Sequence, residues 1–213
     1  MNKKFCDILG YDYEFIYLDN HYNVDNKTAK LYIVNTFLQN SNYDILIFLD
    51  SDAWIQNGYW LNDIINNLIN NDEKQGCFSR DPYVKKNTFI NSGSFIIKNN
   101  DFTKQMYNIC IKELEINNSF HNNWPYDQYY ISKYVFENKE NFTIFIPDIL
   151  NTPIGKVLRH NWCKNQKMYD DLFALYRDIN NDLCFDKTYF IEKDYYDEKD
   201  FPNIIENGYE YFN

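Results

Sequence analysis

The sequence has little positive charge and no long hydrophobic run, and both absences narrow the possible functions. Lys and Arg together number 21, against 31 for Asp and Glu, which gives a formal net charge of −10 at pH 7. No basic patch is available to neutralise nucleic-acid phosphates, so we expect no nucleic-acid partner. No apolar run approaches the roughly 18 residues of a membrane-spanning helix, and no signal peptide is recognisable. We therefore expect a soluble protein.

Closely spaced cysteine pairs are also absent. The five cysteines are odd in number and widely separated, and none forms a Cys-x-x-Cys motif. A structural zinc site is therefore not expected. Widely spaced single cysteines are typical of free thiols in a reducing compartment, so we expect the protein in the cytoplasm or another reducing location.

The hydrophobic pattern indicates an α/β domain. Residues 3–9 and 27–39 have helical patterns, and residues 13–18 and 45–49 have strand patterns. Gly10 is expected to end the first helix as its C-cap, and Asp101 is expected to be the N-cap of a later helix through about Glu115. Helices that alternate with strands predict a layered domain with a mostly parallel sheet flanked by helices. A length of 213 residues is enough for one domain with a substantial core.

The most informative stretch is the short apolar run of residues 45–49 and the acidic residues that follow it. The run is too short for a helix and predicts a central strand buried on both faces. Asp50 and Asp52 follow directly, and on an extended chain residues i and i+2 point to the same side. Ligands of open α/β sheets bind at the carboxyl ends of strands. A divalent cation bridged to phosphate is the partner that best fits two close carboxylates there.

Two other interpretations of the Asp-Ser-Asp sequence stay open. One is an ordinary solvated turn where a strand ends. The other is the nucleophile and acid of a haloacid-dehalogenase-type phosphatase, which the pattern also resembles. Those enzymes usually continue with Gly and Thr, where this chain has Ala53 and Trp54.

Four short motifs together resemble a known enzyme group. They are residues 49–52, residues 91–95, residues 127–128 and residues 160–164, in that order along the chain. This arrangement resembles the retaining glycosyltransferases of the GT-A fold. Within them it is most similar to the fungal α-galactosyl/α-mannosyltransferase and plant xyloglucan xylosyltransferase group, and glycogenin-type enzymes are more distant. The resemblance covers about residues 5–165. It implies one Rossmann-like nucleotide-diphospho-sugar transferase domain over residues 1–213, with a C-terminal helix and an acidic, aromatic tail over 166–213.

The resemblance implies a metal and phosphate site. Asp50, Asp52 and His160 would hold Mn²⁺ or Mg²⁺ against the diphosphate of a nucleotide sugar, with a UDP-sugar favoured over a GDP-sugar. Lys30 and Lys164 would neutralise phosphate oxygens as the nucleotide leaves. His160 is also consistent with an ordinary loop histidine, and Lys30 with a solvated helix residue.

The same resemblance implies a sugar site. Asn91, Ser92 and Gly93 would lie beside the donor sugar or the acceptor, and Trp124 would stack on the acceptor. A structural bulge is the alternative for residues 91–94, because glycine within a strand lets the backbone bend or lets a ligand approach.

Asp127 and Gln128 would be the catalytic residues on the reactive face of the sugar. Both residues are expected in the first turn of a helix over residues 127–136, and Pro125 also fits that first turn. A carboxylate there ordinarily complements the helix dipole. Transfer would go to a hydroxyl group of a glycan, a protein or a small molecule.

This sequence departs from the group in ways that leave a second function open. The group begins with a strand ahead of its first helix, and here only Met1 and Asn2 precede the helix. The glycine usually found between His160 and Cys163 is also absent. A catalytically inactive relative that binds a glycan or a nucleotide sugar is therefore the alternative. A missing first strand would also leave a sheet edge that a second copy of the chain can cover.

Overall fold

The computed structural model describes residues 1–18, 24–81, 89–153 and 155–162. It also describes six residues farther on, which are Gln166, Tyr169, Asp170, Leu172, Phe173 and Arg177. Lys164, the tail and most of the expected C-terminal helix lie outside the described residues.

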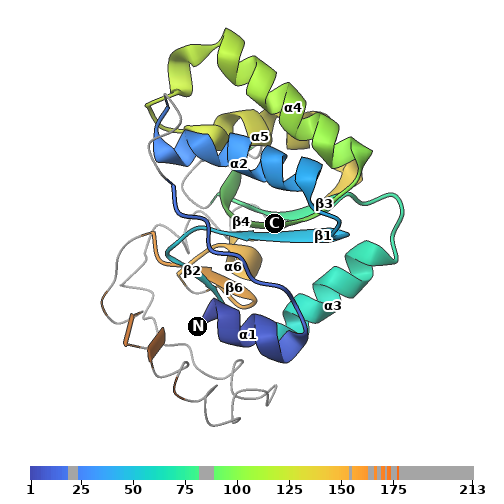
Figure 1. The fold of residues 1–213 in the computed structure, drawn as a ribbon, viewed down its shortest axis with the longest axis vertical. Helices are drawn as coiled ribbons and strands as arrows, with labels where there is room; N and C mark the ends of the chain where they lie inside the picture. The colour runs from blue at the N-terminus through green and yellow to red at the C-terminus, as the bar shows by residue number, and fades with distance from the viewer. Residues whose placement is uncertain are drawn as a thin grey trace, which may run out of the picture.

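The described chain forms three layers, with a four-stranded sheet between two layers of helices (Figure 1). The strands are β1 (Ile45–Leu49), β2 (Ala53–Ile55), β3 (Gly76–Arg80), β4 (Ile90–Lys98), β5 (Phe142–Phe145) and β6 (Leu158–His160). The helices are α1 (Asn2–Leu9), α2 (Asn26–Asn40), α3 (Gly58–Ile69), α4 (Asp101–Ile116), α5 (Asp127–Glu137) and α6 (Pro147–Leu150), with 3-10 turns η1 (Asn118–Phe120) and η2 (Lys139–Asn141). No helix in these described ranges is long and apolar enough to cross a membrane.

The sheet has the strand order β1-β4-β3-β5, and one of its strands runs against the others. β4 pairs antiparallel with both β1 and β3, whereas β3 and β5 are parallel. Three of the four strands therefore run in one direction, as the prediction of a mostly parallel sheet requires. β4 lies between β1 and β3 in the opposite direction, so two of the three pairings are antiparallel.

Two predictions about the strands were wrong. β1 is an edge strand of the described sheet, and all five of its residues are only partly buried, whereas a central strand buried on both faces was expected. Residues 13–18 form no strand, and most of their side chains are exposed. An apolar run indicates that a strand packs against other parts of the protein. It does not indicate whether one or both faces of the strand are buried, or whether the strand is central or at an edge. Among the described residues ahead of β1, none belongs to a strand.

The helices begin and end where local chemistry satisfies their backbone groups. α1 ends at Gly10, as predicted, with the left-handed φ of 74° and an amide that donates to Cys6. α4 begins one residue earlier than expected. Asn100, and not Asp101, is the N-cap, and it forms a reciprocal capping box with Thr103. Pro125 was expected in the first turn of α5, but it precedes the N-cap residue Tyr126.

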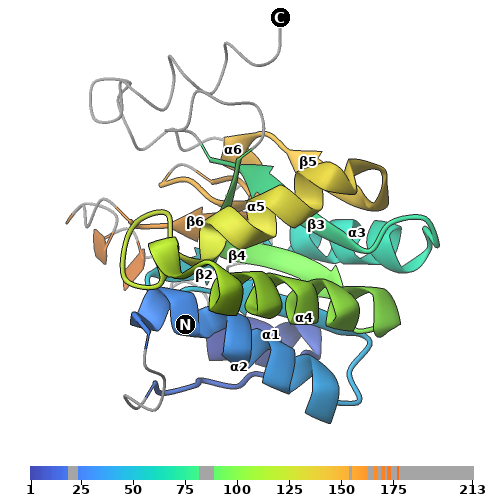
Figure 2. The ribbon, with the colours of Figure 1, turned by 90° about the horizontal axis from the view of Figure 1, so that it is seen from above.

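The hydrophobic core lies on both faces of the sheet. The packing of α2, α4 and α5 on one face is visible from above in Figure 2, where the three helices lie side by side. Alternate residues of β4 point to opposite faces: Phe95 and Ile97 belong to the cluster under these helices, and Ile96 to the cluster on the other face. That second cluster contains residues of α1, α3, α6 and the small β2-β6 sheet. The β2-β6 sheet places β6 beside the segment that follows β1.

Candidate active site

A tight turn brings the two aspartates together after β1. The amide of Ala53 donates to the carbonyl of Asp50 at 2.9 Å, so residues 50–53 form a turn and not an extended segment. The amide of Asp50 donates to Gly93 of β4 at 2.8 Å, and the amide of Asn161 donates to the carbonyl of Asp52 at 2.8 Å. The expectation that strand alternation aligns the two carboxylates was wrong, because the turn aligns them. A backbone hydrogen bond to β4 therefore anchors Asp50, and one from the residue after β6 anchors Asp52.

His160 completes a group of three side chains that could hold a metal ion. In the β2-β6 pairing His160 lies opposite Ala53, next to Asp52. Its Nε2 is 2.9 Å from Oδ1 of Asp52 and 3.7 Å from Oδ2 of Asp50. One ligand atom from each of the three residues lies within 4.8 Å of the other two. An imidazole nitrogen with two carboxylates is a donor set that suits a divalent cation.

The electrostatics of the triad favour an ionised Asp52. Burial raises the pKa of Asp52, but the hydrogen bond and charge of His160, a backbone hydrogen bond and the charge of Lys30 together lower it overall. Asp52 is therefore held in the form that binds a cation.

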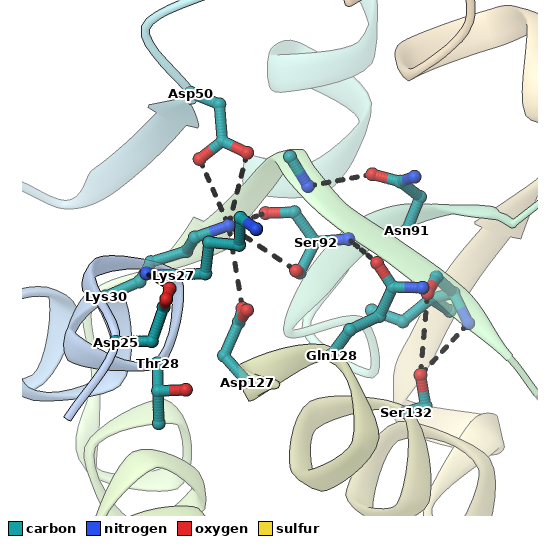
Figure 3. Close-up of polar contacts among 12 residues, drawn as sticks. Asp25, Lys27, Thr28, Lys30, Asp50, Asn91, Ser92, Asp127, Gln128 and Ser132 are labelled. Atoms are coloured by element: carbon teal, nitrogen blue, oxygen red, sulfur yellow. Dashed lines mark hydrogen bonds and ion pairs between the residues drawn. The ribbon is translucent and has the colours of Figure 1, made fainter. Parts of the chain in front are cut away.

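Lys30 lies behind the triad in a buried position. Its Nζ is 3.0 Å from Oδ1 of Asp50 and 3.6 Å from Oδ2 of Asp127, and it donates to the carbonyl of Ser92 at 3.1 Å (Figure 3). Burial lowers the pKa of Lys30, but the carboxylates of Asp127 and Asp50 raise it overall. The predicted contact of Lys30 with phosphate stays a prediction. The structure shows a buried ammonium group that links the two carboxylates.

Asp127 is the most deeply buried carboxylate of this group. It is the first residue of α5, and its exposed fraction is 2%. Its Oδ2 is buried and accepts no hydrogen bond. Burial raises the pKa of Asp127 to about 6, although Lys30 and the hydroxyl of Ser92 lower it in part. Asp127 therefore combines a pKa near neutrality with an oxygen that has no hydrogen-bond donor.

Gln128 and Asn91 point toward a residue that the sequence analysis did not select. Nε2 of Gln128 and Nδ2 of Asn91 donate to the same oxygen of Asp81, at 2.8 and 3.2 Å. Oε1 of Gln128 also accepts a long hydrogen bond from the amide of Ser92 at 3.4 Å. Oδ1 of Asn91 accepts a hydrogen bond of ordinary length from the amide of Gly93 at 2.9 Å. Asp81 directly follows β3, so an acidic residue at a strand end, the signal that identified Asp50, was also available there.

Gly93 contacts His160, which was not expected. A Cβ atom on Gly93 would lie 2.0 Å from Cε1 of the His160 ring, so a larger residue cannot occupy this position without displacing the ring. The predicted approach of a ligand at this glycine stays untested. The side chain that the glycine accommodates in the structure is the imidazole of His160.

Trp124 lies three residues before Asp127 in the chain and is 64% exposed. Its ring centroid is 6.0 Å from that of Phe89. Tyr126 directly precedes Asp127, and Nζ of Lys27 lies 4.3 Å from the centroid of its ring. The exposed ring of Trp124 and the partly buried ring of Tyr126 therefore belong to the segment that leads to Asp127.

The sequence belongs to a family of sugar-transferring enzymes. Residues 2–178 match the family model of Glycosyl transferase family 2, and because this match covers most of the chain, the chain belongs to that family. The protein is therefore a glycosyltransferase by family. This membership replaces the phosphatase interpretation of the Asp-Ser-Asp sequence. The closer resemblance to the fungal and plant retaining enzymes stays a prediction.

A solved structure has the same fold. It is a crystal structure of a glycosyltransferase involved in the glycosylation of the major capsid of PBCV-1. The TM-score is 0.61 at 14% identity, and the match covers 81% of this chain and 88% of that chain. The predicted GT-A fold is therefore confirmed. Among curated proteins, none matches the sequence significantly.

Proposed function

We propose that this protein transfers a sugar from a nucleoside-diphosphate sugar to a hydroxyl acceptor, with Asp50, Asp52 and His160 holding a divalent cation. The observation that carries the proposal is the convergence of these three side chains beside the buried Lys30 and Asp127. In the structure the five come from four segments: α2 carries Lys30, the turn after β1 carries both Asp50 and Asp52, α5 begins with Asp127 and β6 ends with His160. All five meet at the carboxyl end of β1. Nucleotide binding at a strand end is expected for an open α/β sheet.

The chemistry of transfer accounts for the charges of the site. When the bond between the sugar and the diphosphate breaks, the leaving group gains negative charge and the sugar becomes positively charged. A divalent cation in the site would neutralise the charge on the diphosphate. Lys30 holds Asp50 in place and adds positive charge behind it. Asp127 supplies an oxygen near the developing positive charge of the sugar.

The role of Asp127 goes with the face on which the acceptor attacks. If the acceptor attacks on the face of the departing diphosphate, which itself takes the acceptor proton, Asp127 only orients and stabilises the sugar and the product retains the anomeric configuration, as the resemblance implies. If the acceptor attacks on the opposite face and Asp127 takes the proton of its hydroxyl, for which a pKa of about 6 is well suited, the configuration is inverted. Proton NMR of the anomeric centre of the first product decides between the two.

Replacement of Asp127 tests its part in transfer. We expect Asp127→Ala to keep nucleotide affinity and to lower the transfer rate at least about tenfold, which is roughly 1.4 kcal/mol of transition-state stabilisation. Single-turnover rates and a nucleotide titration on the same variant measure both. Full transfer activity in a folded variant would remove Asp127 from the reaction.

The finer predictions concern donor, cation and acceptor. We propose a UDP-sugar in preference to a GDP-sugar, and Mn²⁺ in preference to Mg²⁺. We also propose that the exposed ring of Trp124 stacks on a saccharide acceptor. We further propose that β4 places three residues beside the donor sugar or the acceptor, namely Asn91, Ser92 and Gly93. Lys164 remains a proposed phosphate ligand.

A thermal-shift panel tests the central proposal. UDP, GDP and their sugars are each added with and without Mn²⁺ to the wild type and to Asp52→Ala. A ligand at about 100 times its Kd adds about 2.7 kcal/mol to the free energy of unfolding, and each kcal/mol raises the Tm by about 2–4 °C at this size. We expect a Mn²⁺-dependent shift of several degrees in the wild type and none in Asp52→Ala. An equal shift in both proteins would contradict the assigned metal ligands.

Donor hydrolysis separates an active enzyme from a binding protein. An active transferase releases nucleotide slowly from its donor when Mn²⁺ is present. A wild-type protein that binds the donor but releases no nucleotide, with or without acceptors, would instead support an inactive relative that recognises nucleotide sugars.

A further inference from the structure

Asn151 is a buried polar residue in contact with His160, and it belongs to none of the sequence motifs. It directly follows α6 and has an exposed fraction of 0%. Its Oδ1 is 2.8 Å from Nδ1 of His160, and its Nδ2 donates to the carbonyl of Asn91 at 3.2 Å. Both polar atoms of the side chain therefore have a partner.

These two bonds determine which nitrogen of His160 carries a proton. A backbone carbonyl can only accept, so the NH₂ group of Asn151 must face Asn91. The side-chain oxygen of Asn151 then faces His160, and it can only accept as well. Nδ1 must therefore be protonated. Nε2 faces Asp50 and Asp52, where without a cation its N–H donates to Asp52, and it is the nitrogen whose proton a bound cation would replace.

The segment that carries Asn151 is anchored on several sides. The amide of Leu150 donates to Oγ of Ser79 on β3 at 3.1 Å, and Oγ of Ser94 on β4 donates to the carbonyl of Leu150. The indole of Trp162 donates to the carbonyl of Asn151 at 3.3 Å. Asn151 is thus fixed to the same sheet whose β1 end carries Asp50.

The ring of His160 has little freedom on its other side. It packs against the backbone of Gly93, where a Cβ atom would lie 2.2 Å from Nδ1. The amide of His160 donates to the carbonyl of Thr152 at 3.2 Å, next to Asn151 in the chain. The orientation of the ring is therefore determined by packing, and its tautomer by the Asn151 side chain.

We propose that Asn151 is a positioning residue that holds His160 in the Nδ1-protonated form, so that Nε2 is presented to the divalent cation between Asp50 and Asp52. The inference rests on the proposed function for the presence of the cation. Hydrogen-bond partners of this kind fix the orientation of ligand imidazoles, and their removal costs about 10–100-fold in metal affinity.

The experiment compares three variants for binding of Mn²⁺ alone, without nucleotide, by electron paramagnetic resonance. Asn151→Leu has a similar volume but no acceptor, and we expect its affinity for Mn²⁺ to fall about 10–100-fold. Asn151→Asp keeps an acceptor for Nδ1–H, and we expect its affinity to stay within about threefold of the wild type. Asn99→Leu is the matched control. Asn99 donates to Ser41 beyond the other end of β4, and its loss should leave the affinity unchanged.

A spectroscopic measurement on the wild type does not depend on whether the variants fold. The chain has three histidines, so ¹⁵N spectra of the His rings are simple to assign. In protein loaded with Cd²⁺, we expect His160 to show a protonated Nδ1 and a metal-bound Nε2.

The outcomes distinguish this inference from the proposed function. If the wild type binds Mn²⁺ but Asn151→Leu binds it equally well, or if Cd²⁺ binds Nδ1, the inference is overturned and the metal site stands. If the wild type binds neither cation, both the metal site and the inference are overturned.

Discussion

At the scale of single residues, Asp50, Asp52 and Asp127 lie in one site but have different surroundings. Asp52 is partly exposed and hydrogen-bonded to His160, which lowers its pKa. Asp127 is buried, which raises its pKa to about 6. Two aspartates of one site therefore differ in pKa because of their environment, which agrees with the separate roles proposed for them, a cation ligand for Asp52 and a group beside the reacting sugar for Asp127.

The raised pKa of Asp127 predicts a specific pH dependence of stability. Between the unfolded pKa of about 3.9 and the folded value of about 6, the folded state holds a proton that the unfolded state has lost. The stabilisation is thus present below about pH 4 and is lost as the pH rises through about 6. Relative to Asp127→Asn, the wild type should lose about 1–3 kcal/mol between about pH 4 and pH 7.5. Urea unfolding of both proteins across this range measures the difference.

Asp52→Asn provides a control of opposite sign. Because the pKa of Asp52 is lowered, the wild type should gain stability relative to this variant as the pH rises through about 4. A difference between wild type and Asp127→Asn that does not change with pH would contradict the assigned protonation of Asp127.

At the scale of elements, Gly10 shows how one backbone position ends a helix. Its φ is 74°, and an added Cβ atom would meet no other atom within 4 Å. The cost of a side chain is therefore one of backbone conformation alone. We expect Gly10→Ala to lower the free energy of unfolding by about 1–2 kcal/mol, and Gly10→Asn to cost less because Asn tolerates this conformation. Chemical denaturation of the three proteins tests the order, and an unchanged midpoint for Gly10→Ala would refute it.

The turn of residues 50–53 illustrates what elements contribute to the site. The sequence pattern correctly located the end of β1, because apolar and acidic residues meet there. It did not predict the turn or its anchoring to Gly93 and Asn161, because both partners are far along the chain. The direction of the two carboxylates is set by those distant backbone bonds.

At the scale of the whole molecule, β1 leaves one sheet edge unpaired among the described residues. The amide of Asn99, directly after β4, donates to the carbonyl of Asp44, and the amide of Asp50 donates to the carbonyl of Gly93 in β4. In an antiparallel pair every second residue bonds to the partner strand, so alternate residues between Asp44 and Asp50 direct their backbone groups to β4. The backbone groups of Leu46 and Phe48 therefore point to β4, and those of Ile47 and Leu49 point away from it.

This arrangement predicts alternating hydrogen exchange along β1. The amides of Ile47 and Leu49 should exchange on the order of 100-fold faster than those of Leu46 and Phe48. Amide exchange measured by NMR at low protein concentration tests this. Equal protection of all four amides would contradict a free edge. Protection of Ile47 and Leu49 that increases with protein concentration would instead indicate that a second copy covers β1, as the sequence analysis considered.

The sequence by itself determined the local features of this protein. Hydrophobic periodicity located α1, α2 and β1, glycine placed the end of α1, and the order of the four motifs indicated the GT-A fold. The first two signals are local, because they depend on propensities and side-chain spacing within a few residues. The motif order spans residues 49–164, but each motif in it is a short segment.

Only the tertiary structure decided which residues meet. It placed Lys30 between Asp50 and Asp127, gave Gly93 the role of accommodating His160, and brought Asn151 to the imidazole. The Asn151 side chain bonds to a carbonyl 60 residues away, and Lys30 bonds to one 62 residues away. Contacts at that separation depend on strand order, on the antiparallel course of β4 and on core packing, and none of these is encoded within a single short segment.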